Sequence, residues 1–307
     1  MSAAQLYGVD MFGDSMAPKA SGVVAQRFGF PPFTVLDAKQ GEWQERKRAW
    51  LAVGLKSEVG RGDNLAFNIS MGGYEVGQNS QHANDGTSIF DPVLCELAYR
   101  WFCPPEGQVV DPFAGGSVRG IVAAQLGLDY WGCDLRAEQI EANRAQAETI
   151  CDGIKPVWVC GDSMDTLAHA PVADFVFSCP PYGDLEVYSD DPADLSRMEW
   201  HAFVAAYKRI ILRAVGRLKD DRFACFVVGD FRDNRGFYRD FVSTTIRAFE
   251  ECGARLYNEA ILATPIGSAC MRVTKQFDVS RKMAKTHQNV LVFCKGDPRI
   301  AAKACNS

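Results

Sequence analysis

The chain has 307 residues, a net charge of −5 and 47% hydrophobic residues, which suits one large globular domain with an appendage. This acidic balance excludes a surface that attracts nucleic acid as a whole, so any nucleic-acid contact must come from a local basic patch. No apolar run approaches the roughly 18–20 residues of a membrane span, and the N-terminus lacks the basic start and apolar run of a secretion signal.

The cysteines give a second bound on the class of protein. There are 11 of them, with no C-x-x-C pair and no His/Cys cluster of the kind that binds zinc. Several lie in apolar runs, such as Cys225 in "FACFVV" and Cys294 in "VLVFC". We therefore expect reduced, buried thiols in a cytoplasmic protein that holds no metal.

The N-terminal part, residues 1–87, carries the weaker structural signals. Residues 1–27 have the mixed composition of a loose arm, and "FPPFTVLDA" (30–38) predicts a turn into a short strand or hook. Residues 59–86 are rich in Gly and Asn and predict a long loop, which is typical of functional or mobile segments.

A charged helix is predicted between these segments, at residues 41–55. Trp43, Trp50 and Leu51 follow one another at spacings of seven and eight from the first tryptophan. These spacings place the three side chains on one face of the helix.

From residue 88 onward, strand and helix patterns alternate. Strict alternation predicts an α/β fold, a doubly wound and mostly parallel sheet of seven strands with helices on both faces. The last two strands are joined without an evident helix and predict an antiparallel hairpin at one edge. We expect a catalytic domain over 88–297 with an insertion at 265–288, and a tail at 298–307. Strands are expected at 108–117, 129–135, 155–163, 173–182, 222–230, 254–264 and 289–296, and helices at 91–102, 118–127, 136–150, 198–218 and 237–253.

Three consecutive strands of this pattern each end in an aspartate. The first enters a small-residue turn, "VVDPFAGGS", which matches neither the nucleoside-triphosphate loop nor the G-x-G-x-x-G pyrophosphate turn. Gly115 and Gly116 would let a ligand approach the backbone closely. Asp111 could take a charged amine, Asp134 lies 23 residues later at about the spacing of a ribose-binding acid, and Asp162 could meet an adenine amino group. Each acid alone is more typical of a loop cap, but together with the glycine turn they favour a nucleoside-like ligand.

The turn "DPFAGGS" (111–117) followed by "SCPPY" (178–182) resembles the S-adenosylmethionine-dependent DNA amino-methyltransferases, in the variety carried by phages and prophages. The resemblance covers roughly residues 88–295 and implies a Rossmann-like methyltransferase domain. It also implies S-adenosylmethionine as cofactor, DNA as partner, and methylation of adenine N6 or cytosine N4, as in restriction-modification. The chain departs from the family in having "AGGS" where many members have G-S-G.

The same resemblance assigns cofactor residues. The Gly turn holds the methionine part, and the acids after the second and third strands hold the ribose and the adenine. "SIFDP" (88–92) resembles the segment that closes over the cofactor, although a helix cap and a core phenylalanine would explain it equally well. The assigned residues are Phe90, Asp91, Asp111, Pro112, Phe113, Ala114, Gly115, Gly116, Asp134, Leu135, Asp162 and Ser163.

The Cys-Pro-Pro-Tyr segment is expected to be catalytic. In the family, a side-chain oxygen and the carbonyl of the first proline accept hydrogen bonds from the target amine, while the aromatic residue stacks on a base flipped out of the duplex. The resemblance therefore gives Pro180 the acceptor role and Tyr182 the stacking role. The catalytic candidates are Ser178, Cys179, Pro180, Pro181 and Tyr182.

Cys179 stands where the family has Asp, Asn or Ser, and three interpretations remain open. It is a poor acceptor, with Ser178 or Pro180 supplying the main contact. Alternatively it is a nucleophile for C5 chemistry on a pyrimidine, with Glu186 as a nearby partner acid. Or it only lines the pocket of an enzyme with another substrate, such as RNA or protein. A non-catalytic DNA-binding protein with this fold is a further alternative.

Two basic runs are candidates for nucleic-acid contact, and a solvated surface is the alternative for both. An acidic, proline-interrupted loop at 183–196 is expected to lie over the site or to be a plain connection. The basic residues of the insertion 265–288 are Arg272, Lys275, Arg281, Lys282, Lys285 and His287, against the single acid Asp278; the run 231–239 adds Arg232, Arg235 and Arg239.

Overall fold

The structure is a computed structural model that describes residues 23–39, 41–56, 90–183, 191–264 and 269–306. One sheet of eight strands runs through the molecule in the order β1-β7-β8-β6-β5-β2-β3-β4. Its strands are β1 (Val35–Asp37), β2 (Gln108–Asp111), β3 (Asp129–Asp134), β4 (Val157–Cys160), β5 (Ala173–Ser178), β6 (Leu218–Val228), β7 (Ala254–Ala263) and β8 (His287–Lys295).

The strand directions confirm the predicted fold class. Pairs β1–β7, β2–β3, β2–β5, β3–β4 and β5–β6 are parallel, whereas β8 is antiparallel to both β6 and β7. The sheet has eight strands, one more than predicted, because the hook at residues 35–37 pairs with the outer edge of β7. Every residue of β5 is buried, as expected of a central parallel strand covered on both faces.

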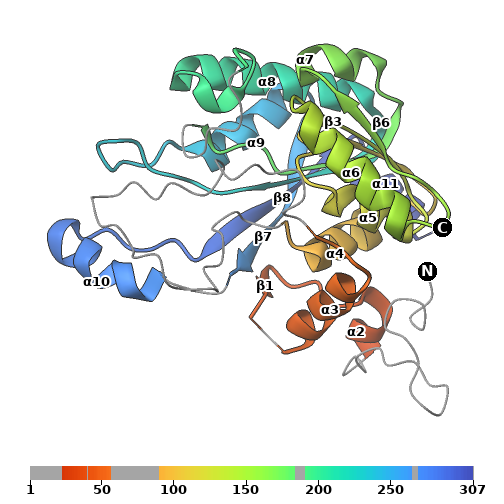
Figure 1. Cartoon of the computed structure of the whole chain (residues 1–307), viewed down its shortest axis with the longest axis horizontal. Helices are drawn as coiled ribbons and strands as arrows, with labels where there is room; N and C mark the ends of the chain where they lie inside the picture. The colour runs from red at the N-terminus through yellow and green to blue at the C-terminus, as the bar shows by residue number, and fades with distance from the viewer. Residues whose placement is uncertain (1–22, 40, 57–89, 184–190, 265–268, 307) are drawn as a thin grey trace.

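Helices cover both faces of the sheet (Figure 1). One hydrophobic cluster joins the sheet to α3, α4, α5, α6 and α11, and a second joins the opposite face to α8 and α9. The helices are α2 (Val23–Phe28), α3 (Gly41–Ala52), α4 (Pro92–Phe102), α5 (Val118–Gln125), α6 (Ala137–Ile150), α7 (Ser163–Thr166), α8 (Trp200–Arg217), α9 (Phe241–Glu251), α10 (Ala269–Ser280) and α11 (Pro298–Cys305). Among the described helices, none combines the length and the apolar character needed to cross a bilayer.

Helix α3 packs on α4 through the predicted tryptophans. Trp43 and Trp50 are 1% and 0% exposed, but Leu51 is 40% exposed, so only the two tryptophans of the predicted face are buried. Leu51 lies about 100° around the helix from Trp50, at the rim of the contact. The fully buried carboxylate of Glu96 in α4 accepts hydrogen bonds from Trp50 and from two nitrogens of Arg46, all 2.9 Å long.

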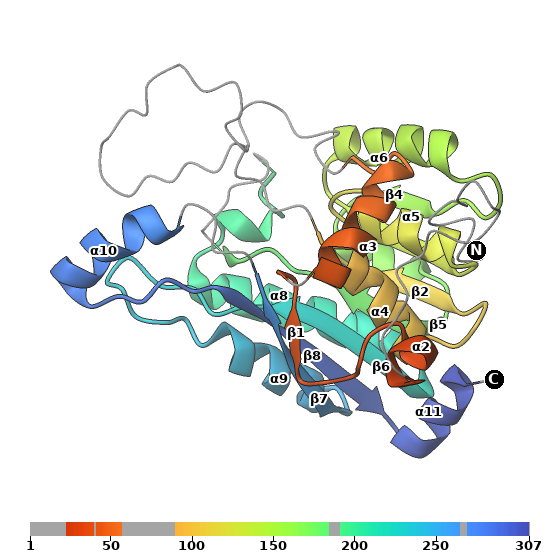
Figure 2. The same cartoon turned by 90° about the horizontal axis from the view of Figure 1, so that it is seen from below.

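Four helices lie where sequence patterns predicted none, and the shortest, α7, follows β4. Part of the predicted loose arm is α2, and the predicted tail contains α11, which Asp297 caps and Pro298 begins. The connection between β7 and β8 contains α10, which contradicts the expected helix-free hairpin. Figure 2 shows α10 extending away from the sheet rather than covering it.

Candidate active site

A cavity of about 380 Å3 lies at the carboxyl ends of β2, β3, β4 and β5, the edge at which open α/β sheets bind ligands. It brings together nearly all of the residues that the sequence assigned to cofactor and substrate. Its lining includes Phe90, Asp91, Pro112, Phe113, Gly115, Gly116, Asp134, Leu135, Asp162, Ser163, Cys179, Pro180, Pro181 and Tyr182. Asp111, Ala114 and Ser178 are fully buried and do not border it.

The glycine turn is held against the end of β3. Gly115 adopts a φ of +49°, a left-handed conformation that a side chain would strain. In this conformation its N–H donates to Asp134 Oδ2 at 3.0 Å, while its carbonyl accepts from Asn143 of α6 at 2.7 Å. The turn therefore lies directly beside the aspartate that the sequence assigned to a ribose.

Asp134 keeps acceptor capacity toward the cavity. Its Oδ1 accepts a hydrogen bond from the backbone N–H of Arg136 at 3.0 Å, so each carboxylate oxygen accepts one hydrogen bond from the protein. Because a carboxylate has about four acceptor positions, about two remain for a ligand. Burial raises the pKa of Asp134 above its ordinary value, although the N–H and the charge of Arg136 and the N–H of Gly115 oppose that shift. The side chain is 19% exposed, which leaves it within reach of a ligand.

Asp162 is both a helix cap and a cavity residue. Its Oδ1 caps α7 by accepting from the N–H of Met164 at 2.8 Å, so the loop-cap interpretation holds for this acid. It also borders the cavity. Ser163 donates to the carbonyl of Pro112 at 2.5 Å, which ties the end of β4 to the glycine turn.

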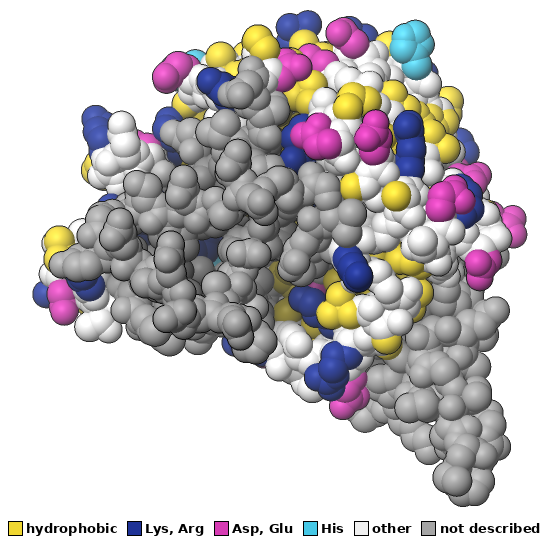
Figure 3. Space-filling view, in the orientation of Figure 1, with side chains coloured by type: hydrophobic (Ala, Val, Ile, Leu, Met, Phe, Trp, Pro, Cys, Tyr) yellow, Lys and Arg dark blue, Asp and Glu magenta, His cyan; other side chains and the backbone are white. Residues whose placement is uncertain are grey.

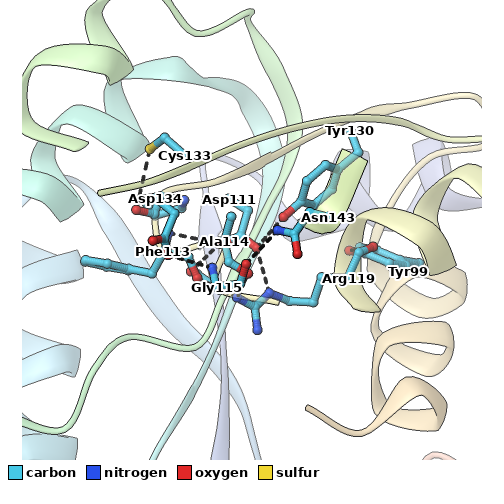
Figure 4. Close-up of polar contacts among 12 residues, drawn as sticks. Tyr99, Asp111, Phe113, Ala114, Gly115, Arg119, Tyr130, Cys133, Asp134 and Asn143 are labelled. Atoms are coloured by element: carbon cyan, nitrogen blue, oxygen red, sulfur yellow. Dashed lines mark hydrogen bonds and ion pairs between the residues drawn. The ribbon is translucent and has the colours of Figure 1, made fainter. Parts of the chain in front are cut away.

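Asp111 has a different role from the one expected, as Figure 4 shows. Its side chain is fully buried, and Arg119 Nε and the hydroxyl of Tyr130 donate to Oδ2 at 2.6 and 2.7 Å. Ser178 Oγ and the N–H of Phe113 donate to Oδ1 at 2.5 and 3.0 Å. The expectation that Asp111 receives a ligand amine is therefore wrong for this structure, since four protein donors already occupy it.

Arg119 links the buried Asp111 carboxylate to the glycine turn through hydrogen bonds. Its Nη2 donates to the carbonyls of Phe113 and Ala114 at 2.5 and 2.9 Å. Burial alone would lower the pKa of Arg119, but the Asp111 carboxylate raises it above its ordinary value. The Asp111–Arg119 ion pair therefore holds the backbone of Phe113 and Ala114 in place beside the cavity.

The segment before α4 closes one end of the cavity. Phe90 lies under the Arg119 guanidinium, 4.6 Å from ring centroid to Cζ. Asp91 caps α4 through Val93 N–H at 2.9 Å, and its Oδ2 accepts from Trp43 Nε1 and Lys47 Nζ at 3.2 and 3.1 Å. The helix-cap interpretation of Asp91 is therefore correct, and the residue borders the cavity as well.

The Cys-Pro-Pro-Tyr segment forms another wall of the same cavity. It follows β5, whose last residue, Ser178, donates its hydroxyl to Asp111. Because Ser178 is also fully buried and does not border the cavity, it is not placed to accept a hydrogen bond from a substrate there. Cys179, Pro180 and Tyr182 border the cavity, and the Tyr182 hydroxyl accepts from Gln288 Nε2 at 2.9 Å.

The two basic runs lie side by side near this wall. Lys285 lies 5.9 Å from the ring centroid of Tyr238, and Lys282 approaches Gly236. Burial lowers the pKa of Lys285, which Asp230 opposes. At the end of the molecule that carries α10, Figure 3 shows basic, hydrophobic and acidic side chains near one another. Arg232, Arg235, Arg281, Lys275, Lys282 and Lys285 are described in this region; the side chain of Arg272 and the whole of Glu186 lie outside the described residues.

Six charged or polar cavity residues were not found from the sequence, and two of them are Asp194 and Thr264. The other four are Lys47, Arg119, Arg136 and Gln288. Lys47 and Gln288 come from α3 and β8, so only the folded chain brings them to the site. Arg119 follows Asp111 by eight residues, and a basic residue inside the helix after the glycine turn was a signal that could have found it.

Comparison with known proteins gives similarity at the level of fold only. No protein-family model and no curated protein matches the sequence. TrmN from Thermus thermophilus aligns over 67% of this chain and 49% of its own, at 14% identity and a TM-score of 0.44. Magnesium protoporphyrin IX methyltransferase from Synechocystis, solved with bound SAM, aligns over 63% and 71%, at 12% identity and 0.41. A second Thermus thermophilus protein, described as a candidate DNA modification methylase, aligns over 45% and 51%, at 18% identity and 0.34.

Proposed function

We propose that this protein transfers a methyl group from S-adenosylmethionine to an exocyclic amine of a DNA base, adenine N6 or cytosine N4. One observation carries the proposal. A single cavity is bordered by the glycine turn with Asp134 and Asp162 and also by the Cys179-Pro180-Pro181-Tyr182 segment. A cofactor bound by the first group would therefore lie next to a base held by the second.

The residues at the first group fit the proposed cofactor. Asp134 retains acceptor positions for the two ribose hydroxyls, and Asp162 borders the cavity for the adenine amino group. Lys47 and Asp91 form an ion pair 3.1 Å long at the cavity wall, which offers both charges to the zwitterionic amino-acid part. When bound, S-adenosylmethionine supplies an electrophilic methyl group on a sulfonium sulfur.

The residues at the second group would orient the base. Tyr182 is held by Gln288 at its hydroxyl and by edge contacts of its ring with Phe231 and Phe241, at centroid distances of 6.3 and 6.0 Å. A flipped base would stack on this fixed ring. The Pro180 carbonyl would accept a hydrogen bond from the amine and so direct the nitrogen lone pair toward the methyl group. Proline suits this position because its ring fixes φ and so restricts the backbone that carries the carbonyl.

A second candidate function is favoured by the thiol of Cys179, which borders the same cavity. As a nucleophile it would add to C6 of a pyrimidine and activate C5 to take the methyl group; loss of the C5 proton would then break the C6–sulfur bond and release the thiol. The substitution Cys179→Ser separates the two. Under the amine mechanism the variant keeps methyl transfer, because no covalent bond to the enzyme forms, whereas under the C5 mechanism transfer is lost.

The proposal is tested by transfer of labelled methyl groups to DNA, RNA and protein in parallel. We expect label in DNA with the wild-type protein and little with Asp134→Ala. The matched control is Asp129→Ala, which changes an exposed aspartate at the other end of the same strand. Label found only in RNA or only in protein would overturn the assignment of DNA as substrate.

A further inference from the structure

We propose that the finger, residues 231–239, together with residues 277–285 before β8, forms a surface that binds unpaired nucleic-acid bases, with Phe237 as the stacking residue. This inference rests on the proposed function, because it names the form of nucleic acid that the site receives. It assigns a role to exposed aromatic side chains that the methyl-transfer site itself does not use.

The finger is a closed turn with a fixed tip. Arg232 and Tyr238 pair across it as an antiparallel bridge. Asp233 accepts from the backbone N–H of Arg235 and of Phe237 at 3.0 and 2.9 Å, and its own N–H donates to the carbonyl of Phe237 at 2.8 Å. The Phe237 backbone is therefore held in place even though its side chain is 67% exposed.

The finger and the second segment leave the sheet at the edge where the cavity lies. Val228, the last residue of β6, pairs with Asn289, and Ala263, the last residue of β7, pairs with His287. The connection before β8 therefore emerges beside the end of β6. Figures 1 and 2 both show the segment after β6 running alongside the segment that follows α10.

The root of the finger contacts the proposed base-binding wall. The Phe231 ring meets the Tyr182 ring edge to face at 6.3 Å. A nucleic-acid strand that places one base on Tyr182 would therefore continue along the finger. This continuity links the surface to the cavity.

On this surface an aromatic ring lies beside a cationic side chain in three places. Arg235 lies 5.6 Å from the Phe237 ring and Arg232 lies 4.1 Å from the Tyr238 ring. On α10 the Phe277 ring, 41% exposed, has Arg281 at 5.2 Å. Cations interleaved with exposed rings match what proteins use to bind single strands, where rings stack on bases and cations meet phosphates.

Three of the four acids on or next to this surface are engaged by protein donors, and the fourth is Asp278. Asp233 caps the finger turn, Asp230 accepts from the N–H of Val242 at 3.1 Å, and Asp240 pairs with Arg247 at 2.9 Å. Asp278 is exposed on α10 beside the aromatic Phe277. The cations therefore outnumber the acids that face outward near the finger, although the protein as a whole carries a charge of −5.

Stacking selects unpaired nucleic acid over closed duplex. In a closed duplex each base face is covered by its neighbours, so an exposed ring cannot reach it without unstacking a step, which costs a few kcal/mol. A single strand, or a duplex opened around a flipped base, presents those faces freely. The preference is therefore expected to appear as tighter binding to unpaired DNA of the same sequence.

The test measures fluorescence anisotropy of the full chain with a labelled DNA single strand and with its duplex. We expect the wild-type protein to bind the single strand more tightly. Phe237→Ala should weaken single-strand binding about tenfold, the effect of losing one stacked base, and should change duplex binding little. The matched control Phe33→Ala removes another ring, 70% exposed, from the part of the chain before α3, and should change neither affinity.

Equal affinity for single strand and duplex, or unchanged single-strand binding by Phe237→Ala, would overturn the inference whatever the methyl-transfer result. Methyl transfer to the single strand should show a raised KM and an unchanged kcat in Phe237→Ala. If Phe237→Ala weakens binding but wild-type protein methylates no nucleic acid, the surface stands and the proposed function fails. If RNA is bound and methylated in place of DNA, the stacking role stands and the assignment of DNA is contradicted.

Discussion

At the scale of single residues, the buried Asp111 carboxylate organises the site without facing it. Arg119, Tyr130, Ser178 and the N–H of Phe113 all donate to it. It therefore ties the turn after β2, the interior of β3 and the end of β5 to one charge. Removing one partner of such a buried pair leaves the other charge uncompensated.

We expect Asp111→Ala to lower the free energy of unfolding by about 3–5 kcal/mol, because Arg119 remains buried without its partner. Ser178→Ala removes a single donor to the charged carboxylate and leaves the ion pair intact, so its cost should be smaller, about 1.5–3 kcal/mol. Urea unfolding of both variants measures the difference. Equal costs for the two variants would contradict the dominant role given to the ion pair.

The position of Asp134 in the cavity leads to a prediction about cofactor binding. Asp134→Asn should weaken binding of S-adenosylmethionine about 10- to 100-fold, because hydrogen bonds to a charged acceptor are worth about 1.5–3 kcal/mol. Asp129→Asn, at the exposed start of the same strand, should bind like the wild type. Isothermal calorimetry gives both dissociation constants, and wild-type affinity in Asp134→Asn would remove this residue from the cofactor site.

The same residue predicts a dependence on pH. Burial raises the pKa of Asp134 above its ordinary value of 3.8, so the folded protein holds this proton over a window in which the unfolded chain has lost it. Stability contributed by the neutral form is therefore lost as pH rises through that window, whereas cofactor affinity should increase there as the carboxylate ionises. Asp134→Asn should flatten both dependences, and a slope that survives in this variant would point to another group.

Single residues also show which parts of the site could be predicted from the sequence and which could not. The Pro-Pro-Tyr segment and the glycine turn with Asp134 and Asp162 are continuous patterns at strand ends, so they could be predicted. The role of Asp111 could not, because burial and the approach of Arg119 and Tyr130 decide it, and neither is encoded in local spacing. Lys47 lies 64 residues before Asp111 in the chain, and its position depends on the packing of α3.

At the scale of elements, the α3–α4 contact brings Lys47 to the cavity. Its centre is the buried Glu96, which Arg46, Arg100 and Trp50 satisfy together. Periodicity predicted the two helices and the shared face of the tryptophans. It did not predict α10, which projects away from the sheet. The start of α11 could have been predicted, because Asp297 is a favourable capping residue and Pro298 stands at the first helical position, where Pro is favoured.

Arg46→Leu tests this contact. We expect a loss of about 3 kcal/mol in the free energy of unfolding, because two of the four hydrogen bonds to the buried Glu96 carboxylate disappear together with one of its two neutralising charges, while Arg100 remains. Arg247→Ala removes an exposed ion pair with Asp240 and should cost less than about 1 kcal/mol. Denaturant unfolding compares the two, and a small effect of Arg46→Leu would show that Glu96 becomes protonated or finds another partner.

At the scale of the whole molecule, the order of the strands places the proposed cofactor site and base site at one edge. The alternation of strands and helices was enough to predict the sheet and its mostly parallel character. It was not enough to place β1, because a three-residue strand acquires its partner only when β7 is already at the edge. The nearness of the two basic runs, which lie 26 or more residues apart in the chain, likewise depends on the antiparallel placement of β8.

The central claim is that an exocyclic amine of a DNA base receives the methyl group, and identification of the methylated nucleoside tests it most directly. DNA treated with the protein and S-adenosylmethionine would be digested to nucleosides and analysed by mass spectrometry. The roles proposed for Pro180 and Tyr182 predict N6-methyladenine or N4-methylcytosine, also with Cys179→Ser. The appearance of 5-methylcytosine, lost in Cys179→Ser, would contradict the account and assign the thiol as a nucleophile.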